Sequence, residues 1–120
     1  EHNNKRQNFA KEYDSRLLAL DWVKTPVIRE GSDHIYHQYS IILDNRIIRK
    51  KFQAYLASKN IPTMIYYPIP LHKQKAYRMY HTKPLPISEK ISQQIISLPI
   101  HPAMDIEQVK FICDAIKKFK

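Results

Sequence analysis

The residues whose types and spacing could do chemistry gather in one stretch, residues 63–77, which reads TMIYYPIPLHKQKAY. Its candidate ligand-binding side chains are Tyr66, Tyr67, His72 and Gln74. Such side chains hydrogen-bond hydroxyls, amides and phosphates, and an aromatic face suits a sugar ring or a base. Pro68 and Pro70 fix the backbone between them, so the polar groups would be held ready at little entropic cost. The residues alone leave two interpretations open: a binding rim, or a surface loop whose tyrosines only pack.

Other patterns that carry chemistry are not found in the sequence. His34 and His37 lie three apart on a predicted strand, so they would point to opposite faces and would not share a metal. Cys113 falls on the apolar stripe of the last predicted helix, which indicates a buried thiol rather than a nucleophile. The single glycine, Gly31, excludes glycine-rich phosphate loops and glycine-dependent RNA-binding motifs. We expect no catalytic residue and no metal site in this chain.

Hydrophobic periodicity predicts helices that alternate with short strands. The expected helices are residues 3–20, 46–59, 88–95 and a last helix that starts with a capping-box pattern at residues 105–108; the expected strands are 35–43, 63–67 and 96–100. Asp44 or Asn45 would cap the second helix, Asn60 would end it in a left-handed conformation, and Ser88 would open the third. A loop with room for a short helix leads through residue 80. The pattern indicates an α/β (α+β) fold in which helices cover a small sheet.

Each predicted element has an apolar face. Along residues 35–43 the odd positions should pack on helices, whereas the even positions, with His34 beside them, are polar enough to meet a ligand. The odd set is Ile35, His37, Tyr39, Ile41 and Leu43, and the even set includes Tyr36 and Gln38. The helical stripes are Phe9, Tyr13, Leu17 and Leu18; Ile47, Ile48, Phe52, Tyr55 and Leu56; Ile91 and Ile95; and Ile106, Val109, Ile112, Ile116 and Phe119. We expect His37 in the core or at an interface.

Composition restricts the partners without choosing one. The chain carries 20 Lys and Arg against 11 Asp and Glu, a formal charge of +9. Such a charge fits nucleic acid, acidic lipid or the diphosphate of a nucleotide sugar, but the cations are spread over several segments, as on a solvated surface. No apolar run is long enough for a bilayer, no signal-peptide pattern opens the chain, and one cysteine fits a reducing compartment. We expect a cytoplasmic protein with neither nucleic acid nor a membrane as its partner.

An ordered set of motifs resembles the C-terminal part of the DegT/DnrJ/StrS sugar aminotransferases. These motifs are HIYHQY from residue 34, IPTMIYYPIPLHKQKAY at residues 61–77, LP at 85–86 and SLPIHP at 97–102. The opening helix, with Asn3, Arg6 and Tyr13, is similar to the segment that links the two domains of that family. The resemblance covers nearly the whole chain. Asn60 stands where many relatives have glycine, yet asparagine tolerates the same left-handed geometry.

The resemblance implies a fold, an activity and partners. The fold would be the small C-terminal domain of aspartate-aminotransferase-type (fold type I) enzymes, a mainly antiparallel sheet covered by helices. Residues 1–120 would form this single domain, with 1–21 as the linking helix and 34–120 as the α/β core. The intact enzyme would be a homodimer that uses pyridoxal 5'-phosphate to move an amino group from glutamate to a nucleotide-linked keto sugar, for surface polysaccharide or related amino-sugar synthesis. The N-terminal catalytic domain would carry the Schiff-base lysine, so this chain alone would hold no cofactor and be inactive.

The resemblance also implies roles for particular residues. Tyr66 and Tyr67 would approach the sugar nucleotide, while His72 and Gln74 would shape the same loop or bind substrate. The segment with His34, Tyr36 and Gln38 would support the site. Two alternatives stay open: a stand-alone basic module that binds nucleic acid, and a structural dimerisation module.

Overall fold

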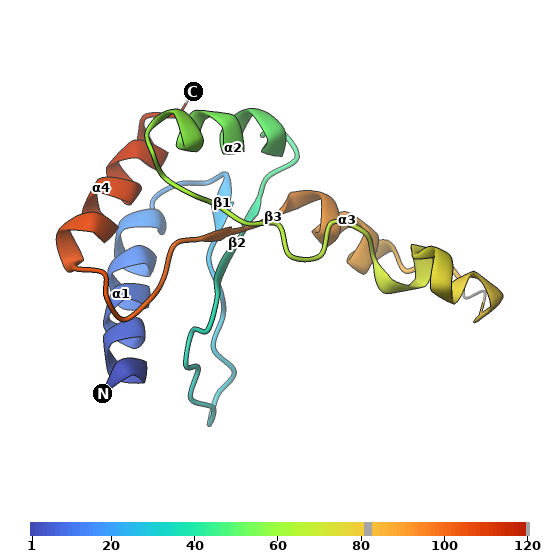
Figure 1. Cartoon of the computed structure of the whole chain (residues 1–120), viewed down its shortest axis with the longest axis horizontal. Helices are drawn as coiled ribbons and strands as arrows, with labels where there is room; N and C mark the ends of the chain where they lie inside the picture. Colours follow the sequence, from blue (N-terminus) through green and yellow to red (C-terminus); the bar gives the residue numbers. More distant parts are fainter. Residues whose placement is uncertain (81–82, 120) are drawn as a thin grey trace.

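The computed structural model of the chain describes residues 1–80 and 83–119, and its strands form one antiparallel sheet flanked by helices (Figure 1). The elements in chain order are α1 (His2–Leu17), β1 (Val23–Lys24), β2 (Tyr39–Leu43), α2 (Arg49–Ser58), η1 (Leu71–Lys73), η2 (Lys75–Tyr80), α3 (Pro86–Gln94), β3 (Ile95–Leu98) and α4 (Ile106–Lys117). β2 is central and pairs antiparallel with both β1 and β3. The predicted small antiparallel sheet with helices around it is confirmed.

The core joins the sheet to α1, α2 and α4, with α1 and α4 packed against each other. Tyr39 on β2 stacks on Tyr13 of α1 with ring centroids 4.7 Å apart. The Tyr39 hydroxyl donates to Asp14 Oδ1 at 2.5 Å, and the Tyr13 hydroxyl donates to the Pro99 carbonyl at 2.8 Å. Burial raises the pKa of both phenols, and each still has a hydrogen-bond partner, as buried polar groups require. These contacts fix α1 on the sheet as part of the core.

Several local predictions are confirmed. Asp105 and Gln108 form the capping box of α4, with the Gln108 amide donating to the Asp105 carboxylate at 2.8 Å. Asn60 follows α2 with a φ of 59°, the left-handed geometry that asparagine tolerates. Cys113 is a buried free thiol, and burial raises its pKa to about 12.

Two helix starts were predicted wrongly. α2 begins at Arg49 rather than residue 46, because the Asp44 carboxylate accepts from the Arg46 amide at 2.9 Å and forms a separate turn there. Ile48 therefore precedes the helix and is 57% exposed, outside the predicted stripe. α3 begins at Pro86 rather than Ser88, because proline suits the first helical position, where no amide donor is needed. Of the other stripe residues, Leu18 and Ile106 are exposed.

The strand predicted for residues 35–43 is regular only from Tyr39. Tyr36 has a φ of 48°, and this left-handed turn sends its ring into the core, 6.0 Å from the Tyr39 ring. The predicted alternation is therefore wrong before Tyr39: Ile35 and His37 are exposed, whereas Tyr36 is buried. His37 is thus not a core residue of this chain. The strand predicted for residues 63–67 is also wrong, since it reduces to one antiparallel bridge between Met64 and Ser97.

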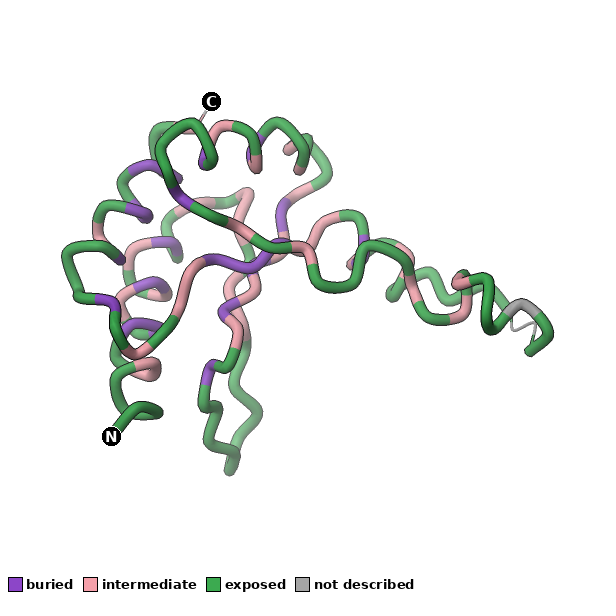
Figure 2. Tube along the Cα trace, viewed as in Figure 1, coloured by how far each residue is buried: buried purple, intermediate pink, exposed green. Residues whose placement is uncertain are grey.

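Residues 67–80 and 83–94, which we call the arm, project away from the core (Figure 1, right). The Cα radius of gyration is 15.6 Å, against roughly 14 Å for a compact domain of this length. Figure 2 shows that burial concentrates in the core, while most of the arm is exposed or intermediate. The arm contains η1, η2 and α3, and with them most of the predicted binding rim.

Candidate functional site

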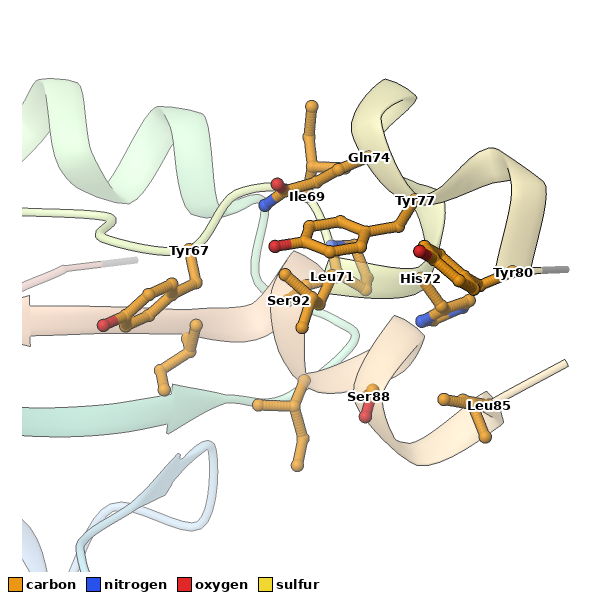
Figure 3. Close-up of a pocket in the computed structure, with 13 residues that line it drawn as sticks. Tyr67, Ile69, Leu71, His72, Gln74, Tyr77, Tyr80, Leu85, Ser88 and Ser92 are labelled. Carbon is orange, nitrogen blue, oxygen red and sulfur yellow. The ribbon is translucent and has the colours of Figure 1, made fainter. Parts of the chain in front are cut away.

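A cavity of about 900 Å³ lies on the arm, between the η1–η2 segment and α3 (Figure 3). We call it the arm groove. Its described lining residues are Tyr67, Ile69, Pro70, Leu71, His72, Gln74, Tyr77, Tyr80, Leu85, Ser88, Ile91, Ser92 and Ile95. Three residues of the predicted rim, Tyr67, His72 and Gln74, are brought together here. The walls are mainly aromatic and aliphatic, with a few polar groups, which is the usual composition of a small-molecule site.

Backbone turns around the prolines set the shape of this segment. The Lys73 amide donates to the Pro70 carbonyl at 2.9 Å, and the Tyr77 amide donates to the Gln74 carbonyl at 3.0 Å. These tight turns are 3-10 helical, so side chains three residues apart fall on one side. Tyr77 and Tyr80 are spaced in this way, and both line the arm groove with Gln74.

A charged cluster ties η1 to the start of α3. Glu89 Oε1 lies 3.1 Å from His72 Nε2 and accepts from the Leu85 amide at 3.2 Å, while Lys73 Nζ donates to Glu89 Oε2 at 2.5 Å. The hydrogen bonds from Lys73 and then His72 hold the pKa of Glu89 at about 2. The His72 side chain is only 12% exposed. Of this cluster only His72 lines the arm groove, and the Glu89 carboxylate that holds it stays ionised near neutral pH.

Arg49, the first residue of α2, fastens the other end of α3 to the core. Its Nη1 donates to the carbonyl oxygens of Ser92 and Ile95 at 2.5 and 3.1 Å, where the helix ends. A cation at this position satisfies carbonyls that the helix leaves without partners and complements the helix dipole. Gln94 Nε2 adds a second contact, donating to Asn45 Oδ1 at 2.5 Å.

The remaining predicted residues lie beside the arm groove rather than in it. Tyr67 borders both the arm groove and a cavity of about 430 Å³ that His34 and Gln38 also line. Tyr66 lines a smaller cavity of about 240 Å³, which shares Gln38 with the previous one. Tyr36 is in the core, and its amide donates to His34 Nδ1 at 2.8 Å. Tyr67 and Gln38 thus each line two of these cavities, while Tyr36 is buried.

Sequence reasoning gave Glu89, Arg49 and Tyr80 no role in the site, and it used Ser88 only as a helix start. Glu89 had a usable signal, since an acidic residue in the first turn after Pro86 can interact with the helix start. Tyr80 could have been found from its i+3 spacing to Tyr77. Arg49 and Ser88 carried no such signal, because their positions depend on how α3 packs against the core.

The arrangement is suited to binding rather than to covalent chemistry. The described lining of the arm groove contains no lysine, arginine or carboxylate, so it offers neither an amine for an imine nor a charge for a phosphate. Within the described residues, no group of three or more His, Cys, Asp or Glu is placed to hold a metal. In the same part of the chain, no helix has the length and apolar character that spanning a membrane requires.

Comparison with known proteins identifies similar chains. The model of the DegT/DnrJ/EryC1/StrS aminotransferase family matches residues 1–117. The dTDP-3-amino-3,6-dideoxy-alpha-D-galactopyranose transaminase of Aneurinibacillus thermoaerophilus is 34% identical over 97% of this chain and 31% of its own length. The UDP-2-acetamido-2-deoxy-3-oxo-D-glucuronate aminotransferase of Pseudomonas aeruginosa is 40% identical over 92% of this chain and 30% of its own length.

Solved structures give the same result. A DegT DnrJ EryC1 StrS aminotransferase from Brucella abortus superposes with a TM-score of 0.85 at 36% identity, over 97% of this chain and 30% of that one. The chain thus spans about 30% of the length of the relatives it matches. These similarities give no support to a stand-alone nucleic-acid-binding or dimerisation module.

Proposed function

Because the chain belongs to the DegT/DnrJ/EryC1/StrS aminotransferase family, we propose that it is one domain of an enzyme that aminates a nucleotide-linked keto sugar with glutamate as donor. The relatives named above are transaminases whose names specify dTDP- or UDP-linked sugars. Since this chain covers about 30% of each, the activity is assigned to the intact protein and not to these residues alone. Amino-sugar synthesis for surface polysaccharides or related products is the corresponding pathway class.

The arm groove is the observation that carries this proposal. It combines the aromatic walls of Tyr67, Tyr77 and Tyr80 with the polar groups of His72 and Gln74. Aromatic faces pack on sugar rings and bases, and a few fixed polar groups orient hydroxyls. Prolines and the Glu89 cluster hold the segment in shape before substrate arrives, so binding requires little ordering. The groove would therefore recognise part of the sugar nucleotide, and Tyr66, His34, Tyr36 and Gln38 would support its edge.

The cofactor requires residues from outside this chain. Pyridoxal 5'-phosphate enzymes hold the cofactor through a Schiff-base lysine and a charged partner for the pyridine nitrogen. The described lining of the arm groove lacks such groups, so these residues alone do not fit the cofactor. An N-terminal catalytic domain would supply those groups. Homodimer formation and a cytoplasmic location are parts of the same proposal.

Kinetics of the full-length enzyme test the proposed role. Tyr67→Phe and His72→Ala should each raise the KM for the nucleotide keto sugar about 5- to 10-fold, as expected for loss of one hydrogen bond of roughly 1 kcal/mol. The absorbance of the bound cofactor should change little, because neither residue is assigned to hold it. His2→Ala, at the exposed start of α1, serves as the control. An unchanged KM in both variants would contradict the proposed role of the groove.

A further inference from the structure

The Glu89 cluster constrains the imidazole of His72 in a way that the proposed substrate site can use. Glu89 Oε1 lies 3.1 Å from His72 Nε2. An ionised carboxylate only accepts hydrogen bonds, so Nε2 must carry a proton for this contact to be favourable. In the neutral ring the other nitrogen, Nδ1, is then the acceptor. The hydrogen bond thus selects one tautomer of a side chain that lines the arm groove.

The carboxylate is itself held in place from several directions. Lys73 Nζ donates to Glu89 Oε2 at 2.5 Å, and the Leu85 amide donates to Oε1 at 3.2 Å. The first contact comes from η1 and the second from the residue just before α3. Because the carboxylate is anchored to both segments, it can fix the orientation of the His72 ring as well as its tautomer.

We propose that Glu89 is a positioning residue for substrate recognition: it holds His72 with the proton on Nε2 and thereby keeps Nδ1 as a hydrogen-bond acceptor. The group that Nδ1 would accept from is a hydroxyl of the sugar in the nucleotide-linked substrate. This inference rests on the proposed function, since it assigns the acceptor to that substrate. Glu89 does not touch the substrate in this scheme and acts through His72.

The test combines a tautomer measurement with a double-mutant cycle in the full-length, cofactor-loaded enzyme. Solid-state NMR of protein with isotope-labelled histidine distinguishes the two neutral tautomers, and the His72 signal is the one lost in His72→Ala. Kinetics with the nucleotide keto sugar compare the single variants Glu89→Gln, Glu89→Asp and His72→Ala with the double variant that combines Glu89→Gln and His72→Ala. Glu107→Gln is the matched control, because Glu107 is also in the first turn of a helix and its carboxylate accepts from Lys110 at 2.7 Å.

In the wild type we expect the Nε2–H tautomer, and in Glu89→Gln a mixture of tautomers. Glu89→Gln should raise KM about 2- to 5-fold, which is less than His72→Ala, because part of the His72 population keeps the Nε2–H tautomer, and kcat should change little. It should add nothing in the His72→Ala background, and Glu89→Asp should recover part of the wild-type KM. Glu107→Gln should match the wild type.

Two results would overturn the inference. The first is a His72 ring that carries a proton on Nδ1 in the wild type, alone or together with one on Nε2, since Nδ1 could then not accept a hydrogen bond. The second is a KM effect of Glu89→Gln that multiplies with that of His72→Ala, since Glu89 would then act independently. Absence of turnover with nucleotide keto sugars would instead contradict the proposed function, and the tautomer measurement, which needs no turnover, would still decide the role of Glu89.

Discussion

Replacing Arg49 should loosen the arm without unfolding the core. Arg49 Nη1 donates to the carbonyls of Ser92 and Ile95 at the end of α3. In Arg49→Met the aliphatic part of the side chain remains, but both carbonyls lose their charged donor. Hydrogen bonds to charged groups contribute about 1.5–3 kcal/mol. Water can reach this half-buried position and replace part of the loss, so we expect a cost of about 2 kcal/mol to the local stability of α3.

Hydrogen exchange measures this local free energy directly. Where local opening limits exchange, about 2 kcal/mol corresponds to roughly 30-fold faster exchange, since each 1.4 kcal/mol is a factor of ten. Peptides that cover residues 86–95 of the full-length protein should show this acceleration. Peptides from α4 should not, because the hydrogen bonds that Arg49 makes among the described residues go to the end of α3.

A matched substitution separates the effect of the contact from that of the lost charge. Lys50→Met removes a cation from the adjacent, exposed position of α2 and should leave exchange in α3 unchanged. If Arg49→Met also left hydrogen exchange in α3 at the wild-type rate, the hydrogen bonds of Arg49 would not stabilise the arm. Equal acceleration in α3 and α4 would likewise refute the reasoning, because the substitution would then have destabilised the whole domain.

Three further outcomes are expected in the full-length protein. The folded-state pKa of Glu89 is about 2, below its ordinary value of 4.5, so its stabilising contribution is complete above pH 4.5 and is lost as the pH falls toward 2. The thermal unfolding temperature of Glu89→Gln should therefore depend less on pH in this window than that of the wild type. Identical pH profiles would contradict a stabilising role of the Glu89 cluster. Burial raises the pKa of the Cys113 thiol to about 12, so Cys113 should react with iodoacetamide at pH 8 only after denaturation. Peptide mass spectrometry measures this labelling, and rapid labelling of the native protein would show that the thiol is accessible. Tyr39→Phe removes the hydrogen bond to Asp14 and should lower the free energy of unfolding by about 1–2 kcal/mol, as measured by denaturant titration. An unchanged midpoint and slope of the titration would exclude a stabilising role for this hydrogen bond.

The elements that the sequence predicted well are those defined by local signals. The stripe of Phe9, Tyr13 and Leu17 and the capping box at Asp105 depend on residues three or four apart, and the structure has both helices. Tyr36 shows the limit of such signals. Its left-handed backbone brings its ring to Tyr39 in the core, and an alternating pattern of side chains does not reveal such a turn.

The candidate site was predicted in part for the same reason. The rim residues lie close together in the chain, and their types alone indicated binding. Consecutive residues can nevertheless face different cavities, as Tyr66 and Tyr67 do. The contact between His72 and Glu89 joins residues 17 positions apart, so it depends on where α3 packs and not on any spacing within one element.

Protection of the arm by ligand tests most directly whether the arm groove receives the sugar nucleotide. Hydrogen exchange of the intact, cofactor-loaded protein would be measured with and without the nucleotide-linked amino sugar that the proposed reaction forms. We expect slower exchange in residues 67–80 and 86–94 when the ligand is bound, with α4 unchanged. Equal exchange rates in those segments, in an enzyme shown to bind the same ligand, would contradict a substrate site on the arm.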